Sequence, residues 1–233
     1  MTFMKAIGII GGMGPEASAL FYQMIIDVCR KKYNAIQDID YPPIFICSIP
    51  LYGFDETGII EEKLILRQLL QGIRKLEQAK SDFVVIACNT VHYFIEELRK
   101  NAKIPILSIV EETLQKLKSE GVTKIGLLAS ESAYRLKTYN GVFDKHKIEV
   151  VIPSKTGQKV ITKVILNVMA GNSSEKDKEI LLSLIDKMKN RHVEAIVLGC
   201  TEIPLVFDGK HSPLKAFNTL EILAESAVER SRR

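Results

Sequence analysis

The sequence predicts an α/β protein in which two similar domains with central parallel sheets face each other. Short apolar runs rich in Val and Ile recur along the chain, as is typical of strands buried on both faces. Helical patterns alternate with these runs, which favours parallel strands joined by right-handed crossovers. Two runs, 84–87 and 196–199, lead into equivalent Cys-Asn-Thr and Cys-Thr-Glu motifs. The second half of the chain therefore repeats the first.

The first half begins with an apolar run that ends at a glycine-rich turn, Gly11-Gly12-Met13-Gly14-Pro15. Pro15 suits the first turn of a helix, and the adjacent Glu16 complements the helix dipole there. Apolar residues at helical spacing follow, and the same alternation then continues. The strands of this half are predicted at 5–10, 44–48 and 83–87, and its helices at 16–31, 59–78 and 91–100.

The second half has the same alternation of strands and helices. Gly121 follows a helical pattern and is typical of a helix C-terminus. Asn218 or Thr219 is expected to cap the last helix, because the side-chain oxygen of either can accept a backbone N–H. The strands are predicted at 104–108, 124–128, 148–152, 195–198 and 214–217, and the helices at 110–119, 134–145, 219–229 and on either side of Gly171-Asn172.

The length of 233 residues allows one large domain or two small ones. Because the motif is repeated, we predict two domains. The first comprises residues 1–103 and 212–233, with the C-terminal helix packing back on it, and the second comprises residues 104–211. The hydrophobic content of 46% is average for a globular protein and supplies enough material for a core.

Composition argues against several classes of protein. No apolar run approaches the ~20 residues of a membrane-spanning helix, and the N-terminus lacks the pattern of a signal peptide. We therefore expect a cytoplasmic protein that has no membrane partner. The 32 Lys and Arg are interleaved with 28 Asp and Glu, which argues against nucleic-acid binding. The cysteines and histidines have no ligand-like spacing, so no metal site is expected.

Two of the four cysteines stand out by position. A buried cysteine is usually a small core residue, and this interpretation suits Cys29 on an apolar helix and Cys47 in a strand. Cys88 and Cys200 instead follow buried strands directly, where open α/β sheets hold their ligands. Residues that can bind an anion come next, and such surroundings favour a thiolate that can act as a base. These residues are Asn89, Thr90, Thr201 and Glu202.

Three motifs together resemble the aspartate/glutamate racemase family. They are Gly-Gly-Met-Gly-Pro after the first strand, Ala-Cys-Asn-Thr-Val-His in the middle and Leu-Gly-Cys-Thr-Glu-Ile near the end. The resemblance implies an isomerase that racemises an amino acid without pyridoxal phosphate or another cofactor, in a cleft between pseudo-symmetric domains. It also implies that Cys88 and Cys200 are the catalytic pair. One, as thiolate, removes the α-proton, and the other, as thiol, returns a proton to the opposite face.

Without pyridoxal phosphate, such an enzyme must stabilise the deprotonated α-carbon by aimed hydrogen bonds. Two residues near the cysteines have alternative interpretations. His92 either tunes Cys88 or caps and packs, and Glu202 is either an orienting base for Cys200 or a charge at a helix start. The residues predicted to bind substrate are Gly12, Met13, Asn89, Thr90, Ser130, Ser132, Thr201 and Glu202.

Departures from the family pattern leave the substrate open among aspartate, glutamate and related amino acids. Where members carry a second Thr, this chain has Ala133, so the hydroxyl is lost or displaced to Ser132. The loop 49–58 is aromatic and apolar where aspartate-specific members place a basic residue. The alternatives are a hydantoin racemase or related isomerase on the same fold, and a non-catalytic ligand-binding homologue. A homodimer is one option for assembly.

Overall fold

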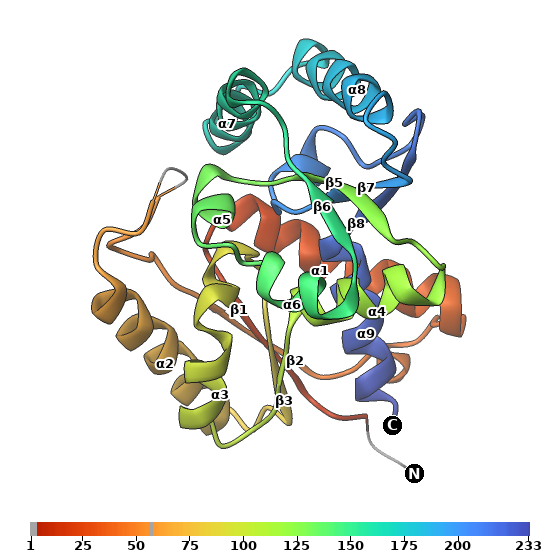
Figure 1. Ribbon diagram of the computed structural model, residues 1–233. Coiled ribbons are helices and arrows are strands. Elements are labelled where there is room, and N and C mark those ends of the chain that lie inside the picture. Colours follow the sequence, from red (N-terminus) through yellow and green to blue (C-terminus); the bar gives the residue numbers. More distant parts are fainter. Residues whose placement is uncertain (1–3, 56–57) are drawn as a thin grey trace.

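Eight strands form two parallel four-stranded sheets in the computed structural model, which describes residues 4–55 and 58–233 (Figure 1). The strands are β1 (Ile7–Gly11), β2 (Ile44–Ser48), β3 (Phe83–Ile86), β4 (Ile106–Leu107), β5 (Lys124–Leu128), β6 (Glu149–Val151), β7 (Ala195–Leu198) and β8 (Lys215–Asn218). Their order is β2-β1-β3-β4 in the first sheet and β6-β5-β7-β8 in the second. The two sheets therefore share one topology, and the predicted α/β fold is confirmed.

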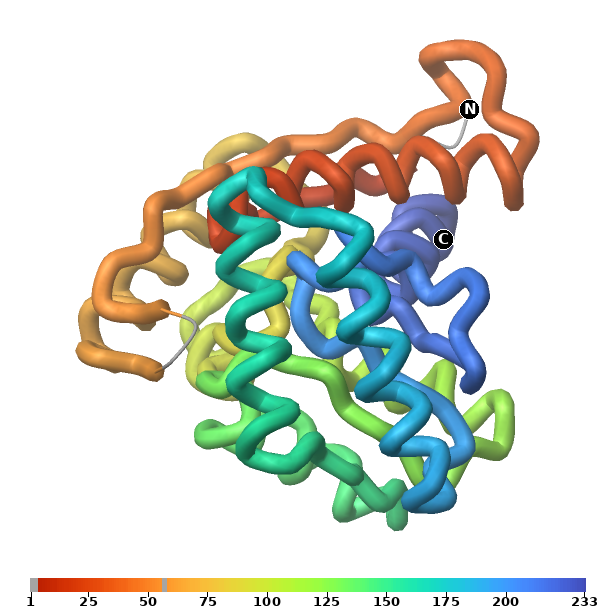
Figure 2. Tube along the Cα trace, turned by 90° about the horizontal axis from the view of Figure 1, so that it is seen from above, coloured from red at the N-terminus to blue at the C-terminus, as the bar shows by residue number. Residues whose placement is uncertain are grey.

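Helices cover both faces of each sheet. They are α1 (Pro15–Tyr33), α2 (Glu62–Gln78), α3 (Ile95–Asn101), α4 (Ile109–Ser119), α5 (Glu131–Arg135), α6 (Asn140–Phe143), α7 (Lys155–Met169), α8 (Glu175–Lys189) and α9 (Thr219–Ser231), with short 3-10 helices η1 (Asp38–Asp40), η2 (Thr90–Phe94), η3 (Asp144–His146) and η4 (Ile203–Leu205). Helices α2 and α3 cover the outer face of the first sheet, and α7 and α8 that of the second. Helices α1, α4 and α9 lie between the sheets (Figure 1). Figure 2 shows α1, in red, beside the C-terminal helix α9, in blue.

Three clusters of buried apolar side chains hold these layers together. The central cluster contains Ile7 and Ile9 of β1 together with Ile125 and Leu127 of β5, so both halves of the chain share it. Alternate side chains, such as Ile10, point into the outer clusters, as expected for strands buried on both faces. The two halves therefore pack around one continuous core.

The C-terminal helix α9 returns to the first half of the molecule. Asn218 caps it, since its Oδ1 accepts the backbone N–H of Leu220 at 3.1 Å. The helix packs on α1 and also on α4. Because α4 and α9 each follow the last strand of a sheet, they occupy equivalent positions at the join between the halves. The helix thus contacts α1 of the predicted first domain and α4 of the predicted second domain, and its assignment to the first domain stays a proposal.

Strands β4 and β8 do not lie in the sheets that the predicted domain division assigns to them. Strand β4 pairs with β3 in the first sheet, although the predicted second domain begins at residue 104. Strand β8 pairs with β7 in the second sheet, although residues 212–233 are predicted in the first domain. Any short buried strand shows the same apolar run, so the pattern does not record which sheet it joins. The rest of the division stays a proposal.

One predicted helix is wrong. The range 134–145 is interrupted, because α5 ends at Arg135 and α6 begins only at Asn140. Lys137, between them, has a φ of 52°, a left-handed conformation that ends a helix. The predicted loop 49–58 includes Glu56 and Thr57, which lie outside the described residues.

No helix within residues 4–55 and 58–233 combines the length and the apolar character that crossing a membrane requires. Within the same ranges, no group of three or more His, Cys, Asp and Glu side chains is arranged to hold a metal ion.

Candidate active site

Cys88 and Cys200 occupy equivalent positions in the two sheets. Each lies two residues beyond the end of its strand, β3 or β7, at the carboxyl edge of the sheet. Each also packs in the outer cluster of its own half. Both side chains are almost fully buried, with exposed fractions of 5% for Cys88 and 6% for Cys200. The two thiols thus lie where parallel sheets of α/β proteins hold their ligands.

The thiol of Cys200 belongs to a hydrogen-bonded cluster centred on Glu202. Cys200 Sγ donates to Glu202 Oε2 at 2.9 Å, and Thr201 Oγ1 donates to the same oxygen at 3.1 Å. The other carboxylate oxygen, Oε1, accepts the backbone N–H of Gly14 at 3.1 Å. Gly14 lies in the turn after β1, so the cluster joins the two halves. Of the two interpretations of Glu202, these contacts favour the one in which it orients the thiol.

Asn89, directly after the first motif cysteine, lies in a buried chain of hydrogen bonds that reaches the second half. Its Oδ1 accepts the hydroxyl proton of Tyr139. Its Nδ2 donates to Thr219 Oγ1 at 3.2 Å, and Thr219 Oγ1 donates to the carbonyl of Leu198 at 2.9 Å. Leu198 is the last residue of β7, two positions before the second thiol. This series of hydrogen bonds therefore connects the two cysteine motifs.

Tyr139 is a residue that sequence reasoning missed. Burial raises the pKa of its hydroxyl well above the usual range, and negative charge at Cys200 or Cys88 raises it further. The hydroxyl of Tyr139 therefore keeps its proton and donates it to Asn89. A charge on either thiol lies close enough to influence the pKa of this hydroxyl. A Cβ at Gly199 would lie 3.2 Å from this hydroxyl, so the small residue before Cys200 leaves room for the ring. Nothing in the sequence marks this tyrosine, because an aromatic residue in an apolar pattern indicates core.

Thr90 and Ser130 meet across the join between the halves, with 3.0 Å between their hydroxyl oxygens. Ser130 also caps α5, accepting the backbone N–H of Ala133 at 3.2 Å. The hydroxyl of Ser132 points elsewhere and donates to the carbonyl of Asp55 at 2.8 Å. The structure thus brings Ser130 to the first cysteine motif and places Ser132 against the loop after β2.

The glycine turn after β1 lines a pocket beside this network. Gly12 has a φ of +93°, and the turn passes close to the backbone of Ile49 after β2. The pocket has a volume of about 220 Å³, and its lining residues are Gly12, Met13, Gly14, Pro15, Leu51, Phe54, Asp55, Leu166 and Met169. The predicted residues Gly12 and Met13 therefore lie at a surface that a small ligand can reach.

A second missed residue, Gln158 of α7, lies near the end of β5. Its Nε2 donates to the carbonyl of Ala129 at 3.2 Å, and a carbonyl only accepts, so the orientation of the amide is fixed. Its Oε1 is a buried acceptor that has no hydrogen-bond partner among the described residues. Ala129 directly precedes Ser130, which places this acceptor beside the network. A lysine-rich helix start gives no sequence signal for such a role.

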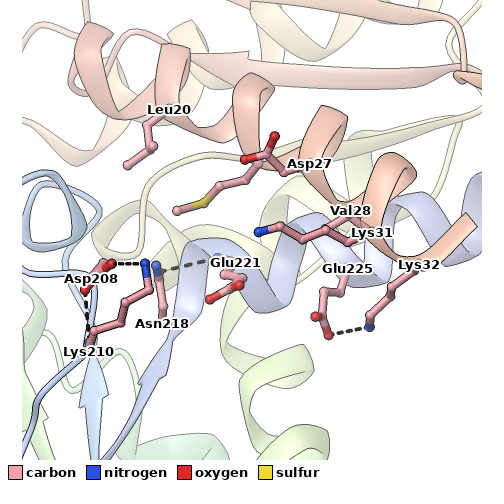
Figure 3. A pocket seen from close by; sticks show the side chains of 11 residues that line it. Leu20, Asp27, Val28, Lys31, Lys32, Asp208, Lys210, Asn218, Glu221 and Glu225 are labelled. Carbon is pink, nitrogen blue, oxygen red and sulfur yellow. Dashed lines mark hydrogen bonds and ion pairs between the residues drawn. The ribbon is translucent and has the colours of Figure 1, made fainter. Parts of the chain in front are cut away.

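A larger hollow lies away from both cysteines. It has a volume of about 290 Å³ and opens between α1, α9 and the segment before β8 (Figure 3). Two ion pairs lie along it: Lys32 of α1 is 2.8 Å from Glu225 of α9, and Lys210 is 2.8 Å from Asp208 on the same segment. Neither Cys88 nor Cys200 lines it, so it is distinct from the candidate site.

Comparison with known proteins decides the family. Residues 10–227 match the family described as Asp/Glu/Hydantoin racemase. The chain belongs to this family. The family resemblance that the three motifs indicated is therefore confirmed. The predicted enzyme class is also confirmed, because racemases are isomerases.

Individual proteins similar to this one cover nearly the whole chain. A relative named broad specificity amino-acid racemase RacX, from Bacillus subtilis (strain 168), is 29% identical over 222 residues, covering 95% of this chain and 96% of its own. The structure of Picrophilus torridus aspartate racemase superposes with a TM-score of 0.85 at 26% identity, covering 98% of this chain and 94% of its own. Allantoin racemase from Klebsiella pneumoniae, at 16% identity and a TM-score of 0.64 over 96% of this chain and 86% of its own, shares the fold.

His92 holds the backbone of the first cysteine motif in place. Its Nδ1 lies 2.8 Å from the carbonyl oxygen of Cys88, and its Nε2 accepts the backbone N–H of Ile109 at 3.1 Å. Because Nε2 accepts, the ring proton is on Nδ1 and is donated to Cys88. Burial lowers the pKa of His92 to about 4, which keeps the ring neutral. These contacts favour the capping and packing interpretation.

We expect the free energy of unfolding to fall as the pH is lowered from 6.5 toward 4. In this window the unfolded chain protonates His92 at its ordinary pKa of 6.5, whereas the buried ring, with its pKa of about 4, stays neutral. The unfolded state then binds more protons, so stability is lost at up to about 1.4 kcal/mol per pH unit. Urea unfolding at several pH values measures this slope. The variant His92→Gln should flatten it, and an unchanged slope would exclude His92 as its source.

Proposed function

We propose that this protein racemises an amino acid by two-base proton transfer at the α-carbon, with Cys88 and Cys200 as the bases. The observation that carries the proposal is the equivalent placing of the two thiols, each two residues beyond a central strand and each almost fully buried. The buried polar chain through Asn89 and Tyr139 couples the two motifs. Membership of the Asp/Glu/hydantoin racemase family supports racemisation as the reaction.

In one direction, the thiolate of one cysteine takes the α-proton and the thiol of the other gives a proton to the opposite face. The intermediate carries extra negative charge on the substrate carboxylate, which fixed hydrogen-bond donors stabilise. Thiols move the protons and fixed donors hold the charge, so the scheme has no step for pyridoxal phosphate. The donors that we assign to this task are the backbone N–H of Met13 and the side chains of Asn89 and Thr90. The N–H of Gly12 donates to Ser18 Oγ and the hydroxyl of Thr201 to Glu202 Oε2, so these two predicted residues line the site without donating to the carboxylate.

The buried acceptor of Gln158 supports an α-amino acid as the substrate. Its Oε1 lacks a partner among the described residues, and leaving a buried acceptor unpaired is costly. A substrate ammonium group carries three donors and would satisfy it. The same amide is held beside Ser130 by its bond to the carbonyl of Ala129. We therefore assign Gln158 to the amino group.

The pocket at the glycine turn supports a substrate whose side chain is less acidic than that of aspartate. Its walls include the apolar residues Leu51, Phe54, Leu166 and Met169. Among the described residues, the charged residue that lines it is the acidic Asp55. A substrate carboxylate placed there would lose hydration without gaining a cation, which is unfavourable. The name of the Bacillus subtilis relative, broad specificity amino-acid racemase, agrees with such a site.

Exchange of the α-proton in deuterium oxide tests the proposal directly. Each L-amino acid is incubated with metal-stripped protein without pyridoxal phosphate, while NMR follows the α-proton and chiral chromatography follows the D-isomer. We expect exchange and racemisation with at least one amino acid, faster with apolar side chains than with aspartate. No exchange with any amino acid would overturn the proposal, and faster exchange with aspartate would overturn the substrate class.

Two other functions are each favoured by one observation. The family description includes hydantoin, and allantoin racemase shares the fold, so a racemase or related isomerase of cyclic substrates is a second candidate. Adding 5-substituted hydantoins to the same panel separates it from an amino-acid racemase.

Ala133 lacks the hydroxyl of the family pattern, which favours a non-catalytic ligand-binding protein. Calorimetric binding of an amino acid without any exchange would identify that function.

The proposal includes a homodimer in the cytoplasm. Strand β2 lies at an edge of the first sheet, and Phe45 and Ile46 on it are 38% and 47% exposed. An exposed apolar edge strand favours association with a second copy. The cytoplasm keeps thiols reduced, as two-thiol chemistry requires. Sedimentation equilibrium measures the mass, and a monomer at every concentration would exclude the dimer.

A further inference from the structure

A racemase that uses two thiols has to reset its protonation after each turnover. One cysteine ends the reaction with the proton that it took, and the other ends as a thiolate. The same enantiomer can react again only after a proton has left the first and another has reached the second. Exposed fractions of 5% and 6% leave Cys88 and Cys200 little direct contact with water. The reset therefore needs a group that connects a buried thiol to solvent.

Glu202 lies between Cys200 and a pocket that reaches the surface. The pocket has a volume of about 170 Å³ and is lined by Glu202, by the turn residues Gly14 and Pro15, and by Met169 of α7. Cys200 is not among its lining residues, but its thiol is 2.9 Å from Glu202 Oε2. The carboxyl group thus has the thiol on one side and water-sized space on the other.

The hydrogen bonds of this carboxylate leave room for one more donor. Oε2 accepts from the thiol of Cys200 and from the hydroxyl of Thr201, which occupies both of its lone pairs. Oε1 accepts the backbone N–H of Gly14, its one donor among the described residues. A carboxylate has about four acceptor positions, so Oε1 can also bind a water molecule in the pocket. The same group can then exchange a proton with the thiol and with water.

We propose that Glu202 exchanges the proton of Cys200 with water in this pocket between turnovers. The S–H bond breaks as Glu202 Oε2 takes the proton, which leaves a thiolate and a neutral carboxyl group. A half-turn of the neutral carboxyl group about its Cγ–Cδ bond brings the protonated oxygen to the water in the pocket. The proton passes to this water, the resulting hydronium gives it up to the buffer, and the carboxylate is restored. The reverse sequence protonates the thiolate. No electrons are transferred. The inference rests on the proposed function, because only a two-thiol racemase needs this reset.

The variant Glu202→Gln tests this proton route, because it should change kcat and kcat/KM to different extents. Glutamine keeps the shape, since its oxygen can accept the N–H of Gly14 while its NH2 group donates to Cys200 Sγ and Thr201 Oγ1, but it cannot take up a proton. The reset contributes to kcat, whereas kcat/KM is measured with the free enzyme forms in equilibrium and excludes it. We expect kcat to fall by roughly tenfold or more and kcat/KM to change by less than about threefold. Equal losses in both, or no loss in either, would overturn the inference.

A second variant keeps the test decisive if the first folds poorly. Glu202→Ala widens the pocket, and formate is small enough to enter it and act as the missing carboxylate. We expect formate to raise the kcat of this variant with concentration, whereas chloride at the same ionic strength does not. No rescue of a lowered kcat would overturn the inference. Glu16→Gln, which removes a carboxylate from the same pocket on α1, should keep the kcat of the unmodified protein.

The failure of this inference can be told apart from the failure of the proposed function. If the unmodified protein exchanges the α-proton of no amino acid, the proposed function is wrong. If it racemises an amino acid and the Glu202 variants lose kcat and kcat/KM together, only the proton route is wrong. Thermal unfolding of each variant shows whether its fold is retained.

Discussion

Replacing Cys88 or Cys200 by alanine should lower the rate of racemisation by about 10² to 10⁴ in both directions. In the proposed reaction each cysteine is the base for one enantiomer and the acid for the other. Losing either one therefore removes a proton transfer from both directions, while the equilibrium between the enantiomers stays the same. Polarimetry started from each pure enantiomer measures both rates.

The two alanine variants should differ in which enantiomer still exchanges its α-proton. The remaining thiol faces one side of the α-carbon, so it can still remove a proton from one enantiomer. In deuterium oxide, NMR should show slow exchange of opposite enantiomers by Cys88→Ala and Cys200→Ala. Cys29→Ala is the matched control, because Cys29 is fully buried on α1 and should leave the rate unchanged. Exchange of the same enantiomer by both variants would contradict a two-sided site.

The sequence predicts most of the fold because buried parallel strands have a distinctive composition. The predicted strands at 44–48, 124–128 and 195–198 coincide with β2, β5 and β7. The assignment of β4 and β8 to sheets could not be predicted, since it depends on packing and not on local pattern. The break at Lys137 was also hidden, because a left-handed turn usually carries glycine or asparagine.

For the candidate site, too, some residues can be predicted from their sequence neighbours, whereas others depend on contacts between residues far apart in the sequence. Cys88 and Cys200 stand out because each follows a strand and precedes polar residues. Tyr139 could not be found from its neighbours, because its partner Asn89 lies 50 positions away in the chain. The contact that gives Glu202 its second anchor, to Gly14, spans 188 positions. Local patterns therefore indicate the two candidate cysteines, and the fold decides which residues hold them in place.

Gly12→Ala should have a large effect on both stability and activity. Gly12 has a φ of +93°, and a Cβ there would lie 2.6 Å from the backbone nitrogen of Ile49 and closer still to its carbonyl oxygen. Backbone atoms cannot rotate away as a side chain can, so the turn itself has to shift. We expect a loss of roughly 3 kcal/mol or more in the free energy of unfolding, from the left-handed conformation and the clash together.

A shift of this turn would also displace Gly14, whose N–H holds the carboxylate that orients the thiol of Cys200. The racemisation rate should therefore fall at least tenfold, since misplacing a catalytic group is costly. Gly121→Ala is the matched control, because Gly121 has a φ of +71° and no atom within 4 Å of an added Cβ. It should lose only about 1 to 2 kcal/mol and keep full activity. Urea unfolding and polarimetry compare the two variants, and equal stability with full activity in both would show that the close approach at Gly12 is not required.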